Sequence, residues 1–297
     1  ENEVLIKVHA AGTNPLDWHK MRGEPVLVRL TDGLFKPKNN RLGADMAGVI
    51  EAVGSQVRRF KPGDAVFGEG GGGSFAEYVC LPEKTLGLIP ANISFAEAAA
   101  VPVAGFTALQ ALRDSGKIQP GQSVLINGAS GGVGTYMVQL AKLFGAEVTA
   151  VCSTRNIELV KKLGADHIID YTQENVVGNG RRYDVVMDNV GNFSAADFRR
   201  MLKPQGIGAM VGFTTLGRML GNVLAGRWAA LRGGPTFGPM LANPNQADIE
   251  LLHEFLAEGV LKSVIDRTYP LRETAEAIRY LETGRAQGKV VISMETS

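Results

Sequence analysis

The stretch VLINGASGGVGTYMVQLAK, residues 124–142, decides the fold of this chain. An apolar run leads into a glycine-rich turn, and a helix is expected after the turn. A strand, a tight turn and a helix in this order are typical of the phosphate-binding corner of a dinucleotide-binding βαβ unit. Glycines let backbone N–H groups approach a pyrophosphate, and the N-terminus of the helix adds partial positive charge. A side chain at Gly131 or Gly132 would obstruct that approach.

The turn departs from the G-x-G-x-x-G pattern at its first position. The aligned residues are Ala129-Ser130-Gly131-Gly132-Val133-Gly134, with alanine where the first glycine belongs. We predict that a dinucleotide binds to Ala129, Ser130, Gly131, Gly132 and Val133. A glycine turn with a purely structural role is the alternative.

The end of the next expected strand, residues 147–151, indicates which dinucleotide binds. An Asp or Glu there would bind the ribose hydroxyls of NAD, but residues 150–156, AVCSTRN, contain no carboxylate. Ser153 can donate to a 2′-phosphate, and the planar cation of Arg155 suits phosphate oxygens. We therefore predict NADP(H) as the cofactor. In the alternative reading, Ser153 caps the following helix and Arg155 is solvated.

Further strands and helices alternate after this stretch. Expected strands at residues 123–127, 147–151, 167–170, 183–188 and 206–212 indicate an α/β fold with a doubly wound parallel sheet. The first 95 residues are instead rich in glycine, proline and short β-branched runs, which predicts an irregular β domain. The final strand, residues 289–294, has the same texture, and we expect it to return to that domain.

Composition limits the function classes that need to be considered. The 297 residues are 45% hydrophobic and 21% charged, which suits a packed core and excludes disorder. A formal charge of +1 gives no attraction to nucleic acid. Two cysteines cannot build a disulfide framework, which favours a cytoplasmic protein. No apolar stretch reaches the ~20 residues of a spanning helix, so we expect no stable membrane insertion.

Motifs spread over most of the chain carry a family resemblance. They are AAGTNPLD at 10–17, GADMAGVI at 43–50, KPGDAV at 61–66, GFTA at 105–108, LGAD at 163–166 and GKVVI at 288–292. With the glycine turn, they resemble the zinc-independent, quinone oxidoreductase-like branch of the medium-chain dehydrogenase/reductase superfamily. The resemblance implies a GroES-like catalytic domain (1–96, completed by 246–297), a Rossmann domain (97–245), an active site in the cleft between them, and a homodimer.

The resemblance also bears on metal content. Zinc-bearing relatives carry a Cys in the segment matching Thr13-Asn14 and a Gly-His-Glu where this chain has Gly43-Ala44-Asp45. Both ligands are absent, and the four histidines lack ligand-like spacing, so we expect no metal. Without a Lewis acid the substrate must already be electron-poor, which selects quinones and α,β-unsaturated carbonyls as hydride acceptors. A non-enzymatic NADPH-binding protein of the same fold, structural or transport-associated, and a dehydrogenase acting on alcohols stay as alternatives.

The resemblance assigns roles to single residues. It implies that Thr107 lies near the nicotinamide, Tyr171 beside the adenine-ribose edge, Val190 and Phe213 along the nicotinamide-ribose side, and Lys289 near the cofactor. Asn14 is expected to bind a substrate carbonyl, and His19 could donate a proton. The alternatives are a helix cap for Thr107, an ordinary strand-end aromatic for Tyr171 and a solvated loop histidine for His19.

Residues 198–247 contain six Lys or Arg and no Asp or Glu. We interpret this basic segment as a flap over the substrate cleft or as part of a dimer surface. A peripheral membrane contact and a merely solvated surface are the alternatives.

Overall fold

The computed structural model describes residues 1–24, 29, 33, 40–212 and 215–294. The chain divides into two compact units. The first unit combines Glu1–Phe106 with Asn243–Ser297, and the second is Thr107–Ala242. We call the second the coenzyme unit. The domain boundaries predicted from the sequence, after residues 96 and 245, stay a proposal.

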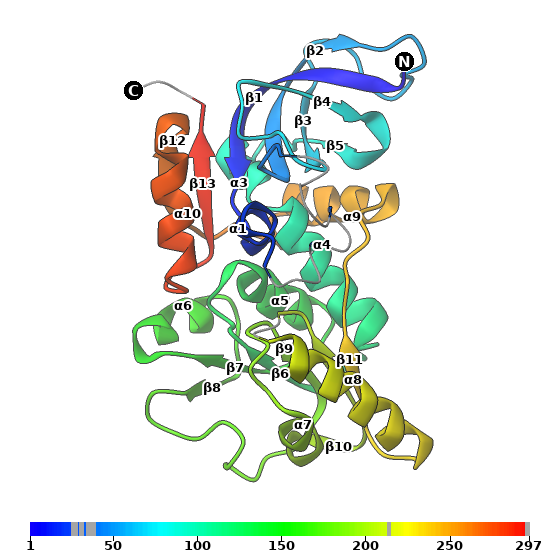
Figure 1. Ribbon diagram of the computed structural model, residues 1–297, viewed down its shortest axis with the longest axis vertical. Coiled ribbons are helices and arrows are strands. Elements are labelled where there is room, and N and C mark those ends of the chain that lie inside the picture. Colours follow the sequence, from blue (N-terminus) through cyan, green and yellow to red (C-terminus); the bar gives the residue numbers. More distant parts are fainter. Residues whose placement is uncertain (25–28, 30–32, 34–39, 213–214, 295–297) are drawn as a thin grey trace. The chain divides into compact units, whose positions relative to one another are not determined.

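The first unit is built on a seven-stranded sheet in the order β12-β13-β1-β2-β3-β5, with β4 paired to β1 (Figure 1). Its strands are β1 (Glu3–Gly12), β2 (Asp45–Val53), β3 (Ala65–Glu69), β4 (Tyr78–Pro82), β5 (Leu86–Leu88), β12 (Ile265–Pro270) and β13 (Lys289–Ser293). Apolar side chains that alternate along β1, such as Val4, Ile6 and Val8, are buried in its core. The last strand, β13, pairs antiparallel with β1.

Some helices of the first unit begin at side-chain caps. The described helices of this unit are α1 (Pro15–Arg22), α3 (Phe95–Ala99), α9 (Gln246–Ala257) and α10 (Thr274–Glu282), and α4 (Pro102–Gln110) leads into the coenzyme unit. Ser94 caps α3, because its Oγ accepts from the Glu97 N–H while the Glu97 carboxylate accepts from the Ser94 N–H. Asn14 occupies the N-cap position of α1, and Pro15 follows at the first helical residue.

The coenzyme unit contains a six-stranded parallel sheet in the order β11-β10-β9-β6-β7-β8. Its strands are β6 (Ser123–Asn127), β7 (Glu147–Cys152), β8 (His167–Asp170), β9 (Tyr183–Asp188), β10 (Leu202–Met210) and β11 (Thr236–Pro239). Read from the first strand, this is the Rossmann order, in which the connection changes direction between β6 and β9. The prediction of an α/β fold with a doubly wound coenzyme domain is confirmed.

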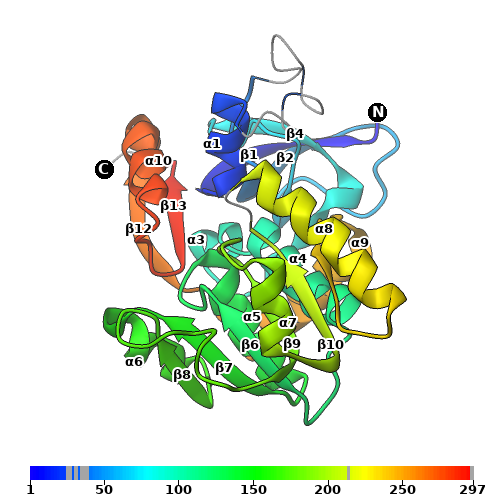
Figure 2. The ribbon, with the colours of Figure 1, turned by 60° about the horizontal axis from the view of Figure 1, so that its bottom comes forward.

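Helices cover this sheet along its length. They are α5 (Gly132–Leu143), α6 (Ile157–Lys162), α7 (Ala195–Met201) and α8 (Leu216–Leu231). The first two contact β6, β7 and β8, and the last two contact β9, β10 and β11 (Figure 2). Under α7, the ring of Phe198 stacks on Phe237 at 5.1 Å and meets Phe193 edge to face at 6.1 Å. These rings join strand, helix and loop into one core.

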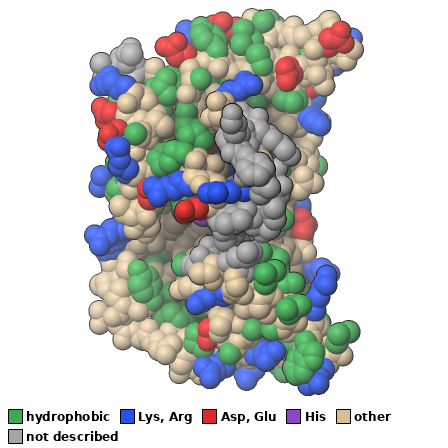
Figure 3. Space-filling model, in the orientation of Figure 1, with side chains coloured by type: hydrophobic (Ala, Val, Ile, Leu, Met, Phe, Trp, Pro, Cys, Tyr) green, Lys and Arg blue, Asp and Glu red, His purple; other side chains and the backbone are tan. Residues whose placement is uncertain are grey.

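Within the basic segment, residues Leu216–Leu231 form the helix α8, which contains three glycines. Gly226 has a packing reason, because a Cβ there would lie 2.0 Å from the Phe237 carbonyl oxygen of β11. Among the described side chains of α8, the large apolar ones that are exposed are Leu220, Leu224, Trp228 and Leu231. Figure 3 shows hydrophobic side chains among Lys and Arg side chains over this part of the coenzyme unit. No helix in the described residues has the length and apolar character needed to cross a membrane.

Replacing Phe198 by Ala is expected to lower the free energy of unfolding by about 3–5 kcal/mol, since the ring is fully buried between two other rings. Denaturation by urea measures the loss. Leu231→Ala in α8 is the control, because 87% of that side chain is exposed, and it should change stability by less than about 0.5 kcal/mol. Equal effects of the two substitutions would contradict this description of the core.

Candidate active site

The carboxyl ends of the parallel strands bring most of the predicted coenzyme residues to one edge of the sheet. The residues at this edge, each following β6, β7, β8 or β9, are Ala129, Ser130, Gly131, Gly132, Val133, Ser153, Arg155, Tyr171 and Val190. Dinucleotides bind at this edge in doubly wound folds, beside the point where the strand order reverses. Of the other predicted coenzyme residues, Thr107 is half-buried in α4 and Lys289 begins β13 of the first unit, while Phe213 is outside the described residues.

The glycine turn has the geometry that a pyrophosphate requires. Gly128 has a φ of +73°, and a Cβ on Gly134 would lie 2.2 Å from the Gly128 carbonyl oxygen, so both glycines are needed for the turn itself. Gly131 differs, because its nearest neighbour to an added Cβ is 3.5 Å away. It is the N-cap of α5, and no side chain of the described residues caps that helix. The first-turn N–H groups are therefore available to a phosphate, and the turn fits the coenzyme.

A buried amide, not predicted from the sequence, supports the turn. Asn156, which is 4% exposed, donates from Nδ2 to Ser130 Oγ at 2.7 Å. Because Asn156 is the last residue of the 3₁₀ turn Thr154–Asn156 after β7, this bond joins the phosphate turn to the segment that carries Ser153 and Arg155. An asparagine at the start of a helix gives no sequence signal for such a contact.

Asp188 organises the loop at the other side of the sheet reversal. It ends β9, is fully buried, and accepts from Asn127 Nδ2 at 2.8 Å and from the N–H groups of Gly191 and Phe193 at 2.9 Å. Burial raises the pKa of this carboxyl, although these hydrogen bonds act in the opposite direction. The carboxylate thereby fixes the loop that presents Val190, which is 43% exposed.

The predicted 2′-phosphate residues lie at the end of β7. Ser153 is half-buried, Arg155 is exposed, and Tyr171 follows β8 with 59% of its surface exposed. The neighbouring strand contributes Asp170, the register partner of Cys152. A hydrogen bond from the Thr154 hydroxyl lowers the pKa of Asp170. This carboxylate is anchored by threonines rather than projecting from the end of β7, where an NAD-binding acid is expected.

A second cluster lies within the first unit, where β1 leads into α1 beside the start of β13. Thr13 donates from both its N–H and its hydroxyl to the Val290 carbonyl at 2.9 Å, which places Asn14 opposite Lys289. Lys289 Nζ donates to Asn14 Oδ1 at 2.6 Å and to Asp45 Oδ2 at 3.0 Å. Asn14 Nδ2 donates to the same Asp45 oxygen at 2.9 Å. We call Asn14, Lys289 and Asp45 the buried triad, since none is more than 3% exposed.

Hydrogen-bond chemistry fixes the orientation of the Asn14 amide. An ammonium has only donors, so the atom facing Lys289 must be the amide oxygen. A carboxylate has only acceptors, so the atom facing Asp45 must be the amide nitrogen. Asp45 also accepts from the Val103 N–H at 2.8 Å. Each member of the triad therefore holds the other two in one arrangement.

Two further carboxyl groups surround the triad. Asp17 accepts from the N–H groups of Asn14 at 2.8 Å and Gly43 at 3.0 Å, and burial raises its pKa to about 6. Glu69 lies opposite Asp45 in the β2–β3 register, so the two side chains share a face of the sheet. Burial, and after it the charge of Asp45, raises the pKa of Glu69 to about 8.

Asp17, Asp45 and Glu69 were not predicted as site residues. The sequence signal that could have found Asp45 is its position directly before the apolar run 46–50, where a charge is buried only with a partner.

His19, the other predicted catalytic residue, lies in α1. Its Nδ1 is 2.6 Å from the Glu24 carbonyl oxygen, and its ring lies 3.7 Å from that of Trp18. Partial burial lowers the pKa of the imidazole. A lowered pKa reduces the fraction of His19 that is protonated near neutral pH. The role of His19 as a proton donor stays a prediction.

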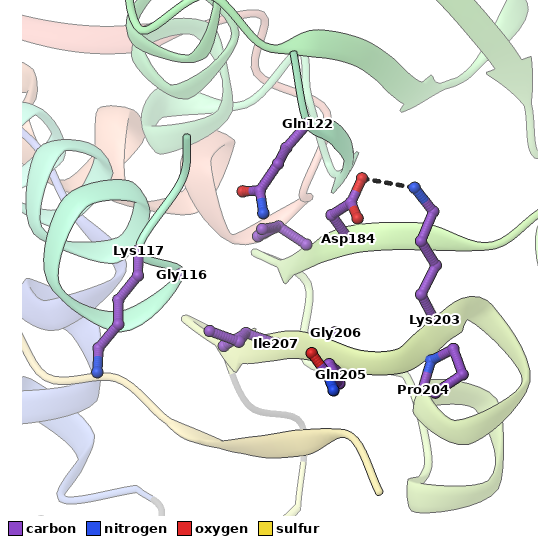
Figure 4. A pocket seen from close by; sticks show the side chains of 10 residues that line it. Gly116, Lys117, Gln122, Asp184, Lys203, Pro204, Gln205, Gly206 and Ile207 are labelled. Carbon is purple, nitrogen blue, oxygen red and sulfur yellow. Dashed lines mark hydrogen bonds and ion pairs between the residues drawn. The ribbon is translucent and has the colours of Figure 1, made fainter. Parts of the chain in front are cut away.

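A separate hollow of about 440 Å³ lies at the opposite, amino edge of the coenzyme sheet (Figure 4). Its lining includes Gln122, Asp184 and Lys203, and the last two form a 2.7 Å ion pair. Because ligands of doubly wound sheets bind at the carboxyl edge, we do not assign the coenzyme to this hollow. Within the described residues, no three His, Cys, Asp or Glu side chains are placed to bind a metal ion.

Comparisons with known proteins place the chain in a family. Residues 1–91 match the alcohol dehydrogenase GroES-like domain, and residues 163–292 match a family described as zinc-binding dehydrogenase. The chain is 39% identical to 2-methylene-furan-3-one reductase of Solanum lycopersicum, over 98% of this chain and 72% of that protein. It is 36% identical to the chloroplastic NADPH-dependent alkenal/one oxidoreductase of Arabidopsis thaliana, with the same coverages. The structure of the quinone oxidoreductase from Coxiella burnetii superposes with a TM-score of 0.86 at 33% identity, covering 99% of this chain and 91% of that one.

The chain therefore belongs to the medium-chain dehydrogenase/reductase family, as the resemblance predicted. Its relatives there include quinone oxidoreductases and enone reductases. It is an oxidoreductase that uses a nicotinamide coenzyme and a small-molecule substrate.

Stability should fall with rising pH because of Glu69. Its folded-state pKa, about 8, exceeds the ordinary 4.5, so the folded chain binds this proton more tightly than the unfolded chain does. The resulting stabilisation is complete below about pH 4.5 and is lost as the pH rises through 8. Between pH 5 and 8.5 the free energy of unfolding of the wild type should therefore fall by about 2–4 kcal/mol more than that of Glu69→Gln. The exposed Glu51→Gln is the control, and unfolding curves with the same pH dependence for E69Q and the wild type would contradict the assignment.

Two glycines of the turn should separate binding from folding. Gly131→Asp places a favourable capping carboxylate at a residue with ordinary extended geometry, so stability should be unchanged or rise by up to about 1 kcal/mol. The same carboxylate competes with phosphate, and the Kd for NADPH should rise at least about tenfold. Gly134→Ala should instead destabilise the fold, since its Cβ would meet the Gly128 carbonyl. Calorimetry measures the Kd for NADPH of each variant, and thermal denaturation measures its stability. Unaltered coenzyme affinity in G131D would refute this placement of the phosphate.

Proposed function

We propose that this protein transfers hydride from NADPH to quinones or α,β-unsaturated carbonyls without a metal ion. The observation that carries the proposal is identity of 39% and 36% to two enone reductases over nearly the whole chain. The uncapped glycine turn supports the coenzyme part of the proposal, and the buried triad supports an oxygen-bearing acceptor.

The reaction needs little from the protein beyond binding and placement. The bound coenzyme supplies the hydride. The α5 amides and the Ser130–Asn156 pair bind and position the pyrophosphate, and the Asp188 loop supports the nicotinamide-ribose side through Val190. On the acceptor side, Asn14 offers an amide N–H to a carbonyl oxygen. Positioning two planar reactants supplies much of the rate.

NADP(H) is the proposed coenzyme in preference to NAD(H). Ser153 and Arg155 follow β7 with no carboxylate at that strand end. Asp170, on the next strand, is engaged by the hydroxyls of Thr154 and Thr172. A 2′-phosphate then finds a hydroxyl and a guanidinium as charge-complementary partners.

We also propose a cytoplasmic homodimer. The support is that β11 is at the edge of the coenzyme sheet, where a strand of a second copy could pair with it. Light scattering of the purified protein tests this, with a dimer mass expected and a monomer mass contradicting it.

The function is tested by following NADPH oxidation with 1,4-benzoquinone, 9,10-phenanthrenequinone, and short and long enones. We expect turnover with electron-poor acceptors that survives dialysis against a chelator. Binding of NADPH without oxidation of any acceptor would favour the non-enzymatic alternative. Ethanol oxidation that is abolished by a chelator would favour an alcohol dehydrogenase.

Arg155→Ala should weaken NADPH binding about 10- to 100-fold, which corresponds to the loss of one charge-assisted hydrogen bond of about 1.5–3 kcal/mol. The Kd for NADH should change less than twofold, because NADH has no 2′-phosphate. Arg181→Ala is the matched control, since that exposed arginine precedes β9 at the opposite edge of the sheet. Parallel titrations with both coenzymes measure the effect, and an equal loss for NADH and NADPH would argue against a 2′-phosphate contact.

A further inference from the structure

The buried triad contains two hydrogen-bond donors that no group in the described part of the chain uses. The Lys289 ammonium has three N–H groups, of which one binds Asn14 and one binds Asp45. The Asn14 amide has two N–H groups, and one binds Asp45. Both side chains are 3% exposed. The N–H groups of an ammonium that is so deeply buried normally all donate hydrogen bonds, because a buried N–H without an acceptor has lost its hydration and is destabilising.

Asp45 explains how a lysine can stay charged in this position. Its carboxylate is fully buried, contacts Lys289 at 3.0 Å, and is fixed on its other oxygen by the Val103 N–H at 2.8 Å. Removing one member of a buried ion pair leaves the other uncompensated. The pair is therefore preorganised, because Asp45 holds the Lys289 ammonium in a buried position before any ligand arrives.

Resting on the proposed function, we propose that Lys289 is a catalytic residue. Its third N–H, with the unused N–H of Asn14, stabilises the negative oxygen that forms on the acceptor, and Asp45 is the positioning residue for both. The Lys289 charge on Asn14 Oδ1 polarises the amide, which strengthens the second donor.

The electron balance defines what these donors must do. When hydride adds to the β-carbon of an enone, the C=C electron pair moves toward the carbonyl, and the carbonyl oxygen becomes an enolate oxygen with a full negative charge. A proton from solvent then adds to the α-carbon. In a quinone, hydride addition likewise leaves a negative oxygen, which solvent protonates. Donors aimed at a developing oxyanion are among the most effective sources of rate, and loss of one costs about 100- to 1,000-fold in kcat.

The triad could instead be only a structural clamp between β1, β2 and β13. The two roles predict different dependences of the rate loss on the chemistry of the acceptor. An oxyanion donor helps most when the acceptor stabilises its own charge poorly, so its loss should hurt an alkyl enone more than 1,4-benzoquinone. A clamp would lower the rates of all acceptors by one factor and would change folding stability or coenzyme affinity with them.

The test is Lys289→Met, with Lys289→Arg to retain the charge and the exposed Lys61→Met as control. We expect K289M to lower kcat about 100- to 1,000-fold with an alkyl enone. With benzoquinone the factor by which kcat falls should be at least about ten times smaller. The Kd for NADPH, measured by fluorescence without turnover, should stay within threefold of the wild type. K289R should recover part of the lost rate, and Lys61→Met should change nothing.

Asp45→Asn tests the positioning role and should reproduce the same ranking of acceptors with a smaller loss. If Met at 289 leaves Asp45 uncompensated and the chain does not fold, the neutral pair D45N/K289M replaces it. A kcat for the alkyl enone within threefold of the wild type, or one common factor for all acceptors, would overturn the proposal. A wild-type protein that reduces no acceptor would overturn the proposed function itself, which is a different result from an active wild type and an unaffected K289M.

Discussion

The buried ion pair between Lys289 and Asp45 is the constraint on which the first unit depends. Two opposite charges that are almost inaccessible to water are stable only when each is the other's partner and when the remaining hydrogen-bonding atoms are met. Asn14 and the Val103 N–H supply most of these hydrogen bonds, so the β1–α1 connection, α4 and β13 converge on one carboxylate at the start of β2. A site that is assembled in this way is rigid before a substrate binds, and rigid donors in a dry environment are what an oxyanion requires.

In the coenzyme unit, the proposed site has to bind a negatively charged pyrophosphate without a bound metal ion. The backbone amides at the start of α5 are available to the phosphates, and the glycines leave space for the phosphates to reach them. Two buried polar pairs, Asn156 with Ser130 and Asn127 with Asp188, fix the loops around this site. The parallel sheet brings these loops together because all its strands end at one edge. Burial raises the pKa of Asp188, and the hydrogen bonds that it accepts from Asn127, Gly191 and Phe193 act in the opposite direction.

The alternating strands and helices of the coenzyme unit could be predicted from the sequence, because buried strands contain continuous apolar runs. The strands at 123–127 and 183–188 are found with the predicted bounds. The strand β11, which is four residues long and contains Gly and Pro, was not predicted. The coenzyme residues could be predicted because they follow strand ends, a local signal. The buried triad could not, because it depends on the pairing of Thr13 with Val290, 277 residues apart, and on a lysine whose partner is set by that register. Asn14 and Lys289 were therefore named separately, and Asp45 was noted only as a departure from a zinc motif.

The central claim is hydride transfer to the β-carbon of an electron-poor acceptor without help from a metal ion. The most direct measurement is to supply chelator-treated protein with NADPH that carries deuterium at C4, on each face in turn, and to locate the label in the reduced enone by NMR. The account predicts deuterium on the β-carbon, from one of the two faces, in a saturated ketone. Deuterium on the former carbonyl carbon, in an allylic alcohol, or label transfer that requires added zinc, would contradict it.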